Sequence, residues 1–262
     1  MPSLALLAPA LFVLVVGTAF MSGIFGMAGG IVLMGALTFF LPVRTAMLLH
    51  GVTQFASNFW RAFVWRHYIA WRVLLPYFAG SITALALFAW VRYEPEKAWV
   101  LLALGIVPFI GFLLPARFAP DVEKPAIGAL CGFVIAAIMI VAGVAGPLLD
   151  VFFVKSKLDR RAVIATKATT QCVGHTMKLI YFGVVVDMAG GFADLPWWIY
   201  AGCIVAAMIG TTLAKGLLER MSDVQFRTWT QRILLVIGTV YLAQGAYKML
   251  EPASPPAQAD SR

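Results

Sequence analysis

The sequence GMAGG (residues 26–30) interrupts one long apolar run, and GVAGP (residues 143–147) interrupts another. An alignment without gaps, which sets residue 26 against residue 143, extends from these breaks through the segments that follow them. It pairs the following identical residues: Gly26 with Gly143, Ala28 with Ala145, Gly29 with Gly146, Leu41 with Leu158, Arg44 with Arg161, Thr53 with Thr170 and Gln54 with Gln171. Matches on glycines, a Thr-Gln pair and cations indicate duplication, because unrelated apolar segments would match mainly at Leu, Val and Ala. A duplicated chain with broken helices is typical of secondary transporters, which bind their substrate between the repeats.

The composition indicates an integral membrane protein. Of the 262 residues, 61% are hydrophobic and only 12% are charged, about half the charged share of an average soluble domain. A spanning helix needs about 20 apolar residues. We therefore predict an all-α membrane fold of eight transmembrane segments, at residues 6–40 with a break, 43–65, 70–91, 97–116, 125–154 with a break, 161–186, 196–215 and 226–249.

These segments form two homologous four-helix repeats, each with one Gly-rich broken helix. We predict a first repeat at 1–116, a linker at 117–124, a second repeat at 125–250 and a disordered tail at 251–262. The first apolar run exceeds a signal sequence in length and lacks a basic start, so we interpret it as a retained helix. Two repeats with an even number of spans each would have the same orientation in the membrane. A hairpin in place of a broken spanning helix would allow inverted repeats instead.

The basic loops predict the orientation in the membrane. Loop 155–161 holds four Lys or Arg residues and loop 215–227 holds three, while 183–196 holds none. The first two loops are therefore expected in the cytoplasm, with both termini outside. Eight continuous spans would place loop 66–72 outside, although it carries Arg66 and Arg72.

Two segments carry a continuous polar face. Positions i, i+4, i+8 and i+11 of a helix lie within about 80° of one another. All eight residues at these positions in the two repeats are polar: His50, Gln54, Asn58 and Arg61 in the first, and Lys167, Gln171, His175 and Lys178 in the second. Thr53 and Thr170 flank the same faces. Polar groups in a bilayer are costly unless they face a protein interior or water, so the pattern predicts a polar cavity between the two helices.

The charges predict that this cavity binds an anion. Every acidic residue lies in or beside an expected loop except Asp150, so the cations on the polar faces lack internal carboxylate partners. Helices that restart at the breaks would add backbone N–H groups near Gly29, Gly30 and Gly146. The candidate anion-binding residues are Gly29, Gly30, Thr53, Gln54, Arg61, Gly146, Lys167, Thr170, Gln171, His175 and Lys178.

Structural interpretations compete with these assignments. Gly23, Gly26 and Gly29 are spaced as in helices that pack closely, and Arg61 is near enough to a helix end to reach the interface. Asp150 is a candidate proton carrier, as is His175, but could also pair with Lys155 or Lys157 or end a half-helix. Cys131, Cys172 and Cys203 are dispersed, and the histidines show no metal-ligand spacing, so we expect no metal and no cofactor.

The breaks at 26–31 and 143–147, with Pro42 and the segment from Ala46 to Gln54, resemble the TauE/SafE family, also called the toluene-sulfonate uptake permeases. The likeness extends over nearly the whole chain in repeat layout and span number. It implies a bacterial inner-membrane permease for sulfite, sulfonates, thiosulfate or related anions, driven by an ion gradient. The chain departs from the commoner pattern at Ala28 and Pro147, which affects the groups that would contact the anion.

We therefore predict a secondary transporter for a small anion that works by alternating access, with the lipid bilayer and a coupling proton or other ion as its further partners. The alternatives are a passive anion channel and a non-transporting membrane subunit whose polar faces form a structural network. An enzyme is the least favoured class, because neither a carboxylate pair nor an activated nucleophile is evident. Nothing in the sequence indicates nucleic-acid binding.

Overall fold

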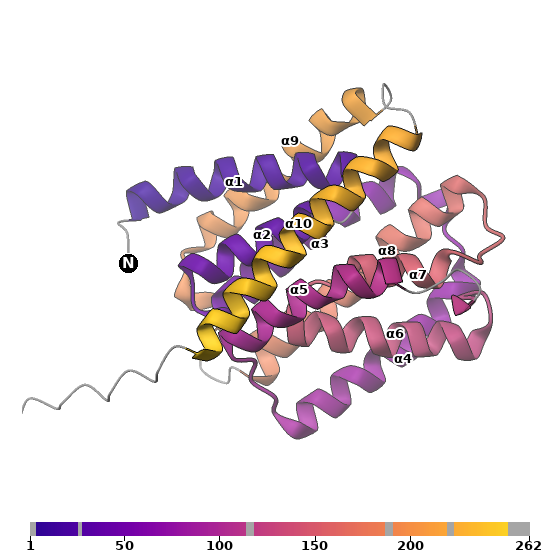
Figure 1. The fold of residues 1–262 in the computed structure, drawn as a ribbon, viewed down its shortest axis with the longest axis horizontal. Helices are drawn as coiled ribbons and strands as arrows, with labels where there is room; N and C mark the ends of the chain where they lie inside the picture. Colours follow the sequence, from indigo (N-terminus) through magenta and orange to yellow (C-terminus); the bar gives the residue numbers. More distant parts are fainter. Residues whose placement is uncertain (1–3, 26–27, 114–117, 187–190, 219–222, 251–262) are drawn as a thin grey trace, which may run out of the picture.

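A computed structural model describes residues 4–25, 28–113, 118–186, 191–218 and 223–250. Within these ranges the fold is helical and contains no strand. The helices are α1 (Leu4–Phe25), α2 (Ala28–Phe40), α3 (Val43–Val64), η1 (Arg66–Tyr68), α4 (Trp71–Val91), α5 (Lys97–Leu113), α6 (Pro125–Ala142), α7 (Gly146–Phe153), α8 (Arg160–Ile180), η3 (Tyr181–Val185), η4 (Gly191–Asp194), α9 (Trp197–Leu218) and α10 (Asp223–Leu250). The predicted all-helical class is confirmed (Figure 1).

Five of these helices, α1, α4, α6, α9 and α10, contain windows long and apolar enough to cross a bilayer. Helices α2 and α5 are apolar but shorter, and α3 and α8 are long but carry the polar faces. Large side chains on the outside are consistent with a lipid environment, since Trp71, Trp90 and Trp197 are 63%, 83% and 79% exposed. The chain is therefore a multi-pass helical membrane protein.

The second broken segment is a hairpin. Helix α6 ends where Gly143 adopts a left-handed conformation (φ 80°), which glycine adopts readily because it has no side chain. The chain then turns and resumes as α7. The backbone N–H of Val122, just before α6, donates to the carbonyl of Phe152, at the end of α7, over 3.2 Å. Both ends of the segment therefore lie at the same end of the molecule.

The first broken segment is also divided into two helices that pack on each other, α1 and α2. Gly29 allows their close approach, because a Cβ atom there would lie 1.9 Å from the carbonyl oxygen of Thr18. The predicted break begins at Gly26, which falls outside the described residues together with Met27. The predicted tail and the first linker residue, 117, also fall outside them.

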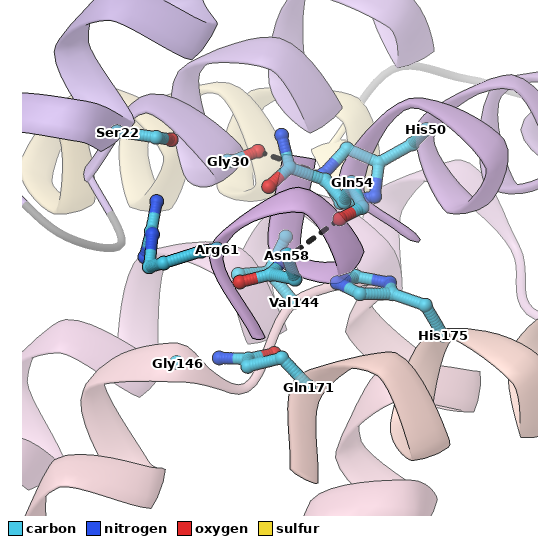
Figure 2. Close-up of a pocket in the computed structure, with 10 residues that line it drawn as sticks. All are labelled: Ser22, Gly30, His50, Gln54, Asn58, Arg61, Val144, Gly146, Gln171 and His175. Atoms are coloured by element: carbon cyan, nitrogen blue, oxygen red, sulfur yellow. Dashed lines mark hydrogen bonds between the residues drawn. The ribbon is translucent and has the colours of Figure 1, made fainter. Parts of the chain in front are cut away.

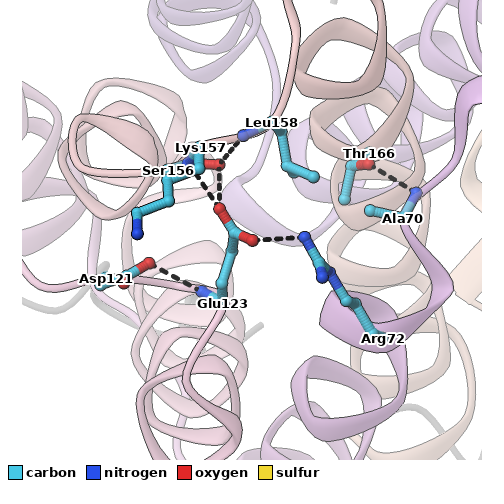
Figure 3. A network of polar contacts seen from close by, with 8 residues as sticks. All are labelled: Ala70, Arg72, Asp121, Glu123, Ser156, Lys157, Leu158 and Thr166. Carbon is cyan, nitrogen blue, oxygen red and sulfur yellow. Dashed lines mark hydrogen bonds and ion pairs between the residues drawn. The ribbon is translucent and has the colours of Figure 1, made fainter.

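The loops around residues 66–72, 118–124 and 154–161 meet at one end of the fold. The Arg161 guanidinium donates to the hydroxyl of Tyr68 over 2.8 Å, and Arg72 pairs with Glu123 over 2.5 Å. The other carboxylate oxygen of Glu123 accepts hydrogen bonds from the backbone N–H of Lys157 and the hydroxyl of Ser156 (Figure 3). These contacts join the three loops directly.

The prediction that loop 66–72 lies across the membrane from loop 155–161 is therefore wrong. It assumed that residues 125–154 cross once, whereas the α6–α7 hairpin returns to the end where it started. With the loops together, the basic residues of both accumulate at one end. The positive-inside rule then predicts a cytoplasmic location for that end, and loop 66–72 no longer conflicts with it.

The packing of the helices follows a regular scheme. Helix α3 packs on α8 and α5 on α10, while α1 packs on α9 and α6 on α4 (Figure 1). In addition, α3 contacts α9 and α8 contacts α4, and α2 contacts α10 as α7 contacts α5. Each helix of α1–α5 can be exchanged with its counterpart in α6–α10, α1 with α6, α2 with α7 and so on. After this exchange every contact named above becomes another of these contacts or stays the same. The α3–α8 pair brings the two polar faces together.

Candidate functional site

A small internal cavity of about 30 Å³ lies where the polar faces of α3 and α8 meet the two breaks. Its walls come from five places in the sequence: the end of α1, the start of α2, helix α3, the α6–α7 break and helix α8. The lining residues are Ser22, Gly30, His50, Gln54, Asn58, Arg61, Val144, Gly146, Gln171 and His175 (Figure 2). No acidic side chain is among them.

The predicted face of the first repeat lines this cavity completely. His50, Gln54 and Asn58 are at most 7% exposed, and Figure 2 shows Arg61 on the side of the cavity opposite the two histidines. From the second repeat, Gln171 and His175 line the cavity, whereas Lys167 and Lys178 do not. The helical periodicity therefore placed most of the polar face correctly but did not reveal how the two lysines are used.

Lys178 is fully buried, at 0% exposure, and connects the two breaks. Its Nζ donates to the carbonyl of Gly143 over 3.0 Å and lies 2.8 Å from Nδ1 of His50. Nε2 of His50 lies 3.0 Å from the carbonyl of Gly30, which can only accept. Nε2 therefore donates, and in neutral His50 the other ring nitrogen, Nδ1, accepts from Lys178.

Lys167 forms an ion pair with Asp150 away from the cavity lining. The two side chains are 22% and 53% exposed. The expectation that the cations lack internal carboxylate partners is therefore wrong for Lys167. Pairing with Lys155 or Lys157 is one of the alternatives that the sequence leaves open for Asp150. The hairpin places Asp150 on α7 beside α8 instead, within reach of Lys167.

Other predicted residues form helix-internal or packing contacts. The hydroxyl of Thr53 donates to the Leu49 carbonyl over 2.7 Å, and that of Thr170 donates to the Lys167 carbonyl over 2.8 Å. Gly29 faces α1, as described above, while Gly30 and Gly146 line the cavity. Of the predicted glycines, these two are the ones placed to approach a ligand.

Several polar groups at the cavity have no partner among the described residues. The Arg61 side chain forms neither a hydrogen bond nor an ion pair there, and Nε2 of Gln54, Nδ1 of His175 and Oγ of Ser22 are buried and unsatisfied. The three buried atoms cost about 1–3 kcal/mol each when unpaired, and Arg61 is partly buried beside them. Such a cluster is expected where a polar ligand or water completes the hydrogen bonds.

Ser22 was not predicted as a site residue. It lies one turn before the first break and is 4% exposed, and its position at the break is the signal that could have identified it. Among the described residues, no group of three or more His, Cys, Asp or Glu side chains could hold a metal ion. The three cysteines are buried and unpaired.

These features define a multi-pass helical membrane protein with a donor-rich cavity between α3, α8 and the two breaks, and no acidic side chain lines this cavity. A family model named sulfite exporter TauE/SafE matches residues 10–241. The chain belongs to this family, which is a family of membrane transporters. Comparison with curated proteins and with solved structures gave no match.

Proposed function

We propose that this protein is a secondary transporter that binds a small sulfur oxyanion, sulfite or a sulfonate, in the cavity between α3 and α8. The observation that carries the proposal is the contrast within the lining: Arg61 and three unsatisfied polar atoms face a space with no acidic side chain. Arg61 is partly buried, and a cation inside a membrane protein without a carboxylate is costly unless an anion or water compensates it. Sulfite, the anion in the name of the family, is a small oxyanion of the kind that this lining suits.

The chemistry of the lining suits an oxyanion. A guanidinium presents a planar fork of donors that matches two oxygens of one anion. The amides of Gln54 and Gln171 can add neutral donors, and the start of α7 at Gly146 adds backbone N–H groups at the positive end of a helix dipole. Gly30 keeps the opposite wall free of side-chain atoms.

The size of the cavity favours a carrier over an open channel. A volume of about 30 Å³ accommodates roughly one or two water molecules. An oxyanion with its oxygens in contact with Arg61 therefore requires the lining helices to separate. This agrees with alternating access, in which one half moves against the other around a fixed site.

The two halves in this proposal are inverted repeats, residues 1–116 and 125–250, joined by the linker 117–124. The exchange relation among the helix contacts supports this arrangement. A hairpin returns to the side of the membrane on which it starts, so a half made of one hairpin and three further segments crosses the membrane three times. The second half then begins on the side opposite to the first. The four-segment repeats of the sequence prediction keep their boundaries, with the broken segment counted as a hairpin. We place the protein in the bacterial inner membrane.

Exchange across a membrane tests the proposal. Purified protein in liposomes loaded with unlabelled sulfite should take up radiolabelled sulfite at equal pH on both sides, with saturation. Thiosulfate, a short sulfonate and sulfate, added as competitors, would rank the substrates. Uptake no faster than in protein-free liposomes for every anion would contradict the proposal, and flux that rises linearly without saturation would indicate a channel.

A further inference from the structure

The carbonyl end of α6 contacts the cationic side chain of Lys178. A helix that ends inside the protein leaves carbonyl oxygens without intrahelical donors and a partial negative charge. At the end of α6 the carbonyl oxygen of Gly143 accepts a hydrogen bond from Nζ of Lys178, and the two atoms are 3.0 Å apart. The Lys178 side chain is fully buried. In transporters with broken helices, such carbonyl ends hold the coupling ion.

The two repeats differ in how they use the corresponding cation. Arg61 and Lys178 occupy equivalent positions in the repeat alignment, each close to the break of its own half. Arg61 lines the cavity and has no side-chain partner among the described residues, whereas Lys178 donates to Gly143 and to His50. An arginine stays charged in a protein, but a lysine can lose its proton when it is buried. Arg61 therefore carries a permanent charge, whereas the charge of Lys178 can be removed.

The surroundings of Lys178 allow its proton to leave. Its two hydrogen-bond partners are uncharged, a carbonyl and the ring of His50. The ring of His175, one turn away on α8, lies 5.6 Å from that of His50 and has an unsatisfied Nδ1 at the cavity. A path of titratable groups thus leads from Lys178 to the cavity.

No carboxylate among the described contacts fixes the charge of Lys178. The remaining titratable or charged groups on helices packed against α8 are Arg44 and Arg61 on α3, Arg72 and Tyr77 on α4, Cys131 on α6, Asp150 on α7, Arg66, His67 and Tyr68 on η1 and Tyr181 on η3. Asp150 pairs with Lys167, Arg72 with Glu123, and the Tyr181 hydroxyl with the carbonyl of Tyr93.

We propose that Lys178 carries the coupling proton of this transporter, with its ammonium occupying the α6 carbonyl end in place of a metal ion, so that transport is coupled to protons and not to Na⁺. The inference rests on the transport function proposed above. When Lys178 is protonated, its bonds to Gly143 and His50 hold α8 against the α6 end and against α3. Release of one proton leaves a neutral amine, weakens the bond to the carbonyl and allows the helices to separate.

The test uses the full-length protein in liposomes, with radiolabelled sulfite and a trapped pH dye. Wild type should show sulfite exchange without any gradient, sulfite accumulation under an imposed pH gradient, and the same accumulation when Na⁺ is replaced by choline. Lys178→Met should keep exchange but lose the stimulation by the pH gradient. Lys167→Met, on the same helix but paired outside the cavity, is the matched control and should retain both.

The outcomes separate the two proposals. Absence of sulfite exchange in wild type would contradict the transport function and, with it, this inference. Exchange together with intact pH-driven accumulation in Lys178→Met would overturn the inference alone. If the variant does not fold, wild type still decides, with a short sulfonate as substrate because it does not titrate near neutral pH. Sulfonate movement that changes the trapped pH without Na⁺ supports the inference, and accumulation that requires Na⁺ contradicts it.

Discussion

Nζ of Lys178 lies 2.8 Å from Nδ1 of His50, although 128 positions separate the two residues in the chain. This contact joins the central helices α3 and α8, and with the carbonyls of Gly30 and Gly143 it forms a continuous chain of hydrogen bonds between the two breaks. The buried polar groups of this chain satisfy one another, while those around Arg61 do not. The centre of the protein thus contains a completed network beside an incomplete one.

Removing His50 should destabilise the fold through Lys178. His50→Ala leaves a buried Nζ with one partner fewer, at a cost of about 1–3 kcal/mol. His50→Gln can restore an acceptor for Lys178 and should recover part of the loss. Thermal unfolding in detergent, followed by size-exclusion chromatography, measures both variants. Equal melting temperatures for His50→Ala and wild type would contradict a structural role for this contact.

Two adjacent glycines should respond differently to the same substitution. A Cβ at Gly29 would lie 1.9 Å from a backbone oxygen of α1, whereas one at Gly30 would lie 3.4 Å from Oε1 of Gln54. Gly29→Ala should therefore destabilise the protein by about 1–3 kcal/mol. Gly30→Ala should fold and weaken sulfite binding instead, because it adds a methyl group to the cavity wall. Melting temperature and sulfite affinity, measured on both variants, distinguish packing from ligand contact. Two variants with the same profile would refute the division.

The hairpin of α6 and α7 predicts which loops share a side of the membrane. Single cysteines at the exposed positions Arg66 and Lys157 should react with an impermeant maleimide from the same side, and a cysteine at Glu94 should react from the opposite side. The native cysteines are buried, so wild type is the control for background labelling. Opposite accessibility of positions 66 and 157 would instead support a single crossing by residues 125–154. In right-side-out membrane vesicles, positions 66 and 157 should be protected, because we expect the basic end to be cytoplasmic.

Much of this architecture could be predicted from the sequence, because apolar length and helical periodicity are local properties. The polar face from His50 to Arg61 lines the cavity as its spacing predicts. The hairpin could not be read in this way, since a Gly-rich break is equally compatible with a kink and a reversal. The partners of Lys167 and Lys178 depend on that reversal, which brings α7 and the carbonyl of Gly143 beside α8.

Local rules also did not anticipate the contacts of two threonines and one glycine. Thr53 and Thr170 satisfy carbonyls of their own helices, a common use of hydroxyls in membrane helices. Gly29 faces α1 rather than the cavity. Position along a face limits where a side chain can point, but only the packed neighbours determine whether its polar atoms remain available for a ligand.

The central claim is that the cavity beside Arg61 binds the transported anion, and sulfite exchange in liposomes by Arg61→Ala tests it most directly. An Arg bond to an anion contributes about 1.5–3 kcal/mol, so the apparent affinity for sulfite should fall by roughly 10- to 100-fold. Arg66→Ala, an exposed arginine just beyond the same helix, should leave exchange unchanged. Sulfite exchange by folded Arg61→Ala with wild-type affinity and rate would contradict the account.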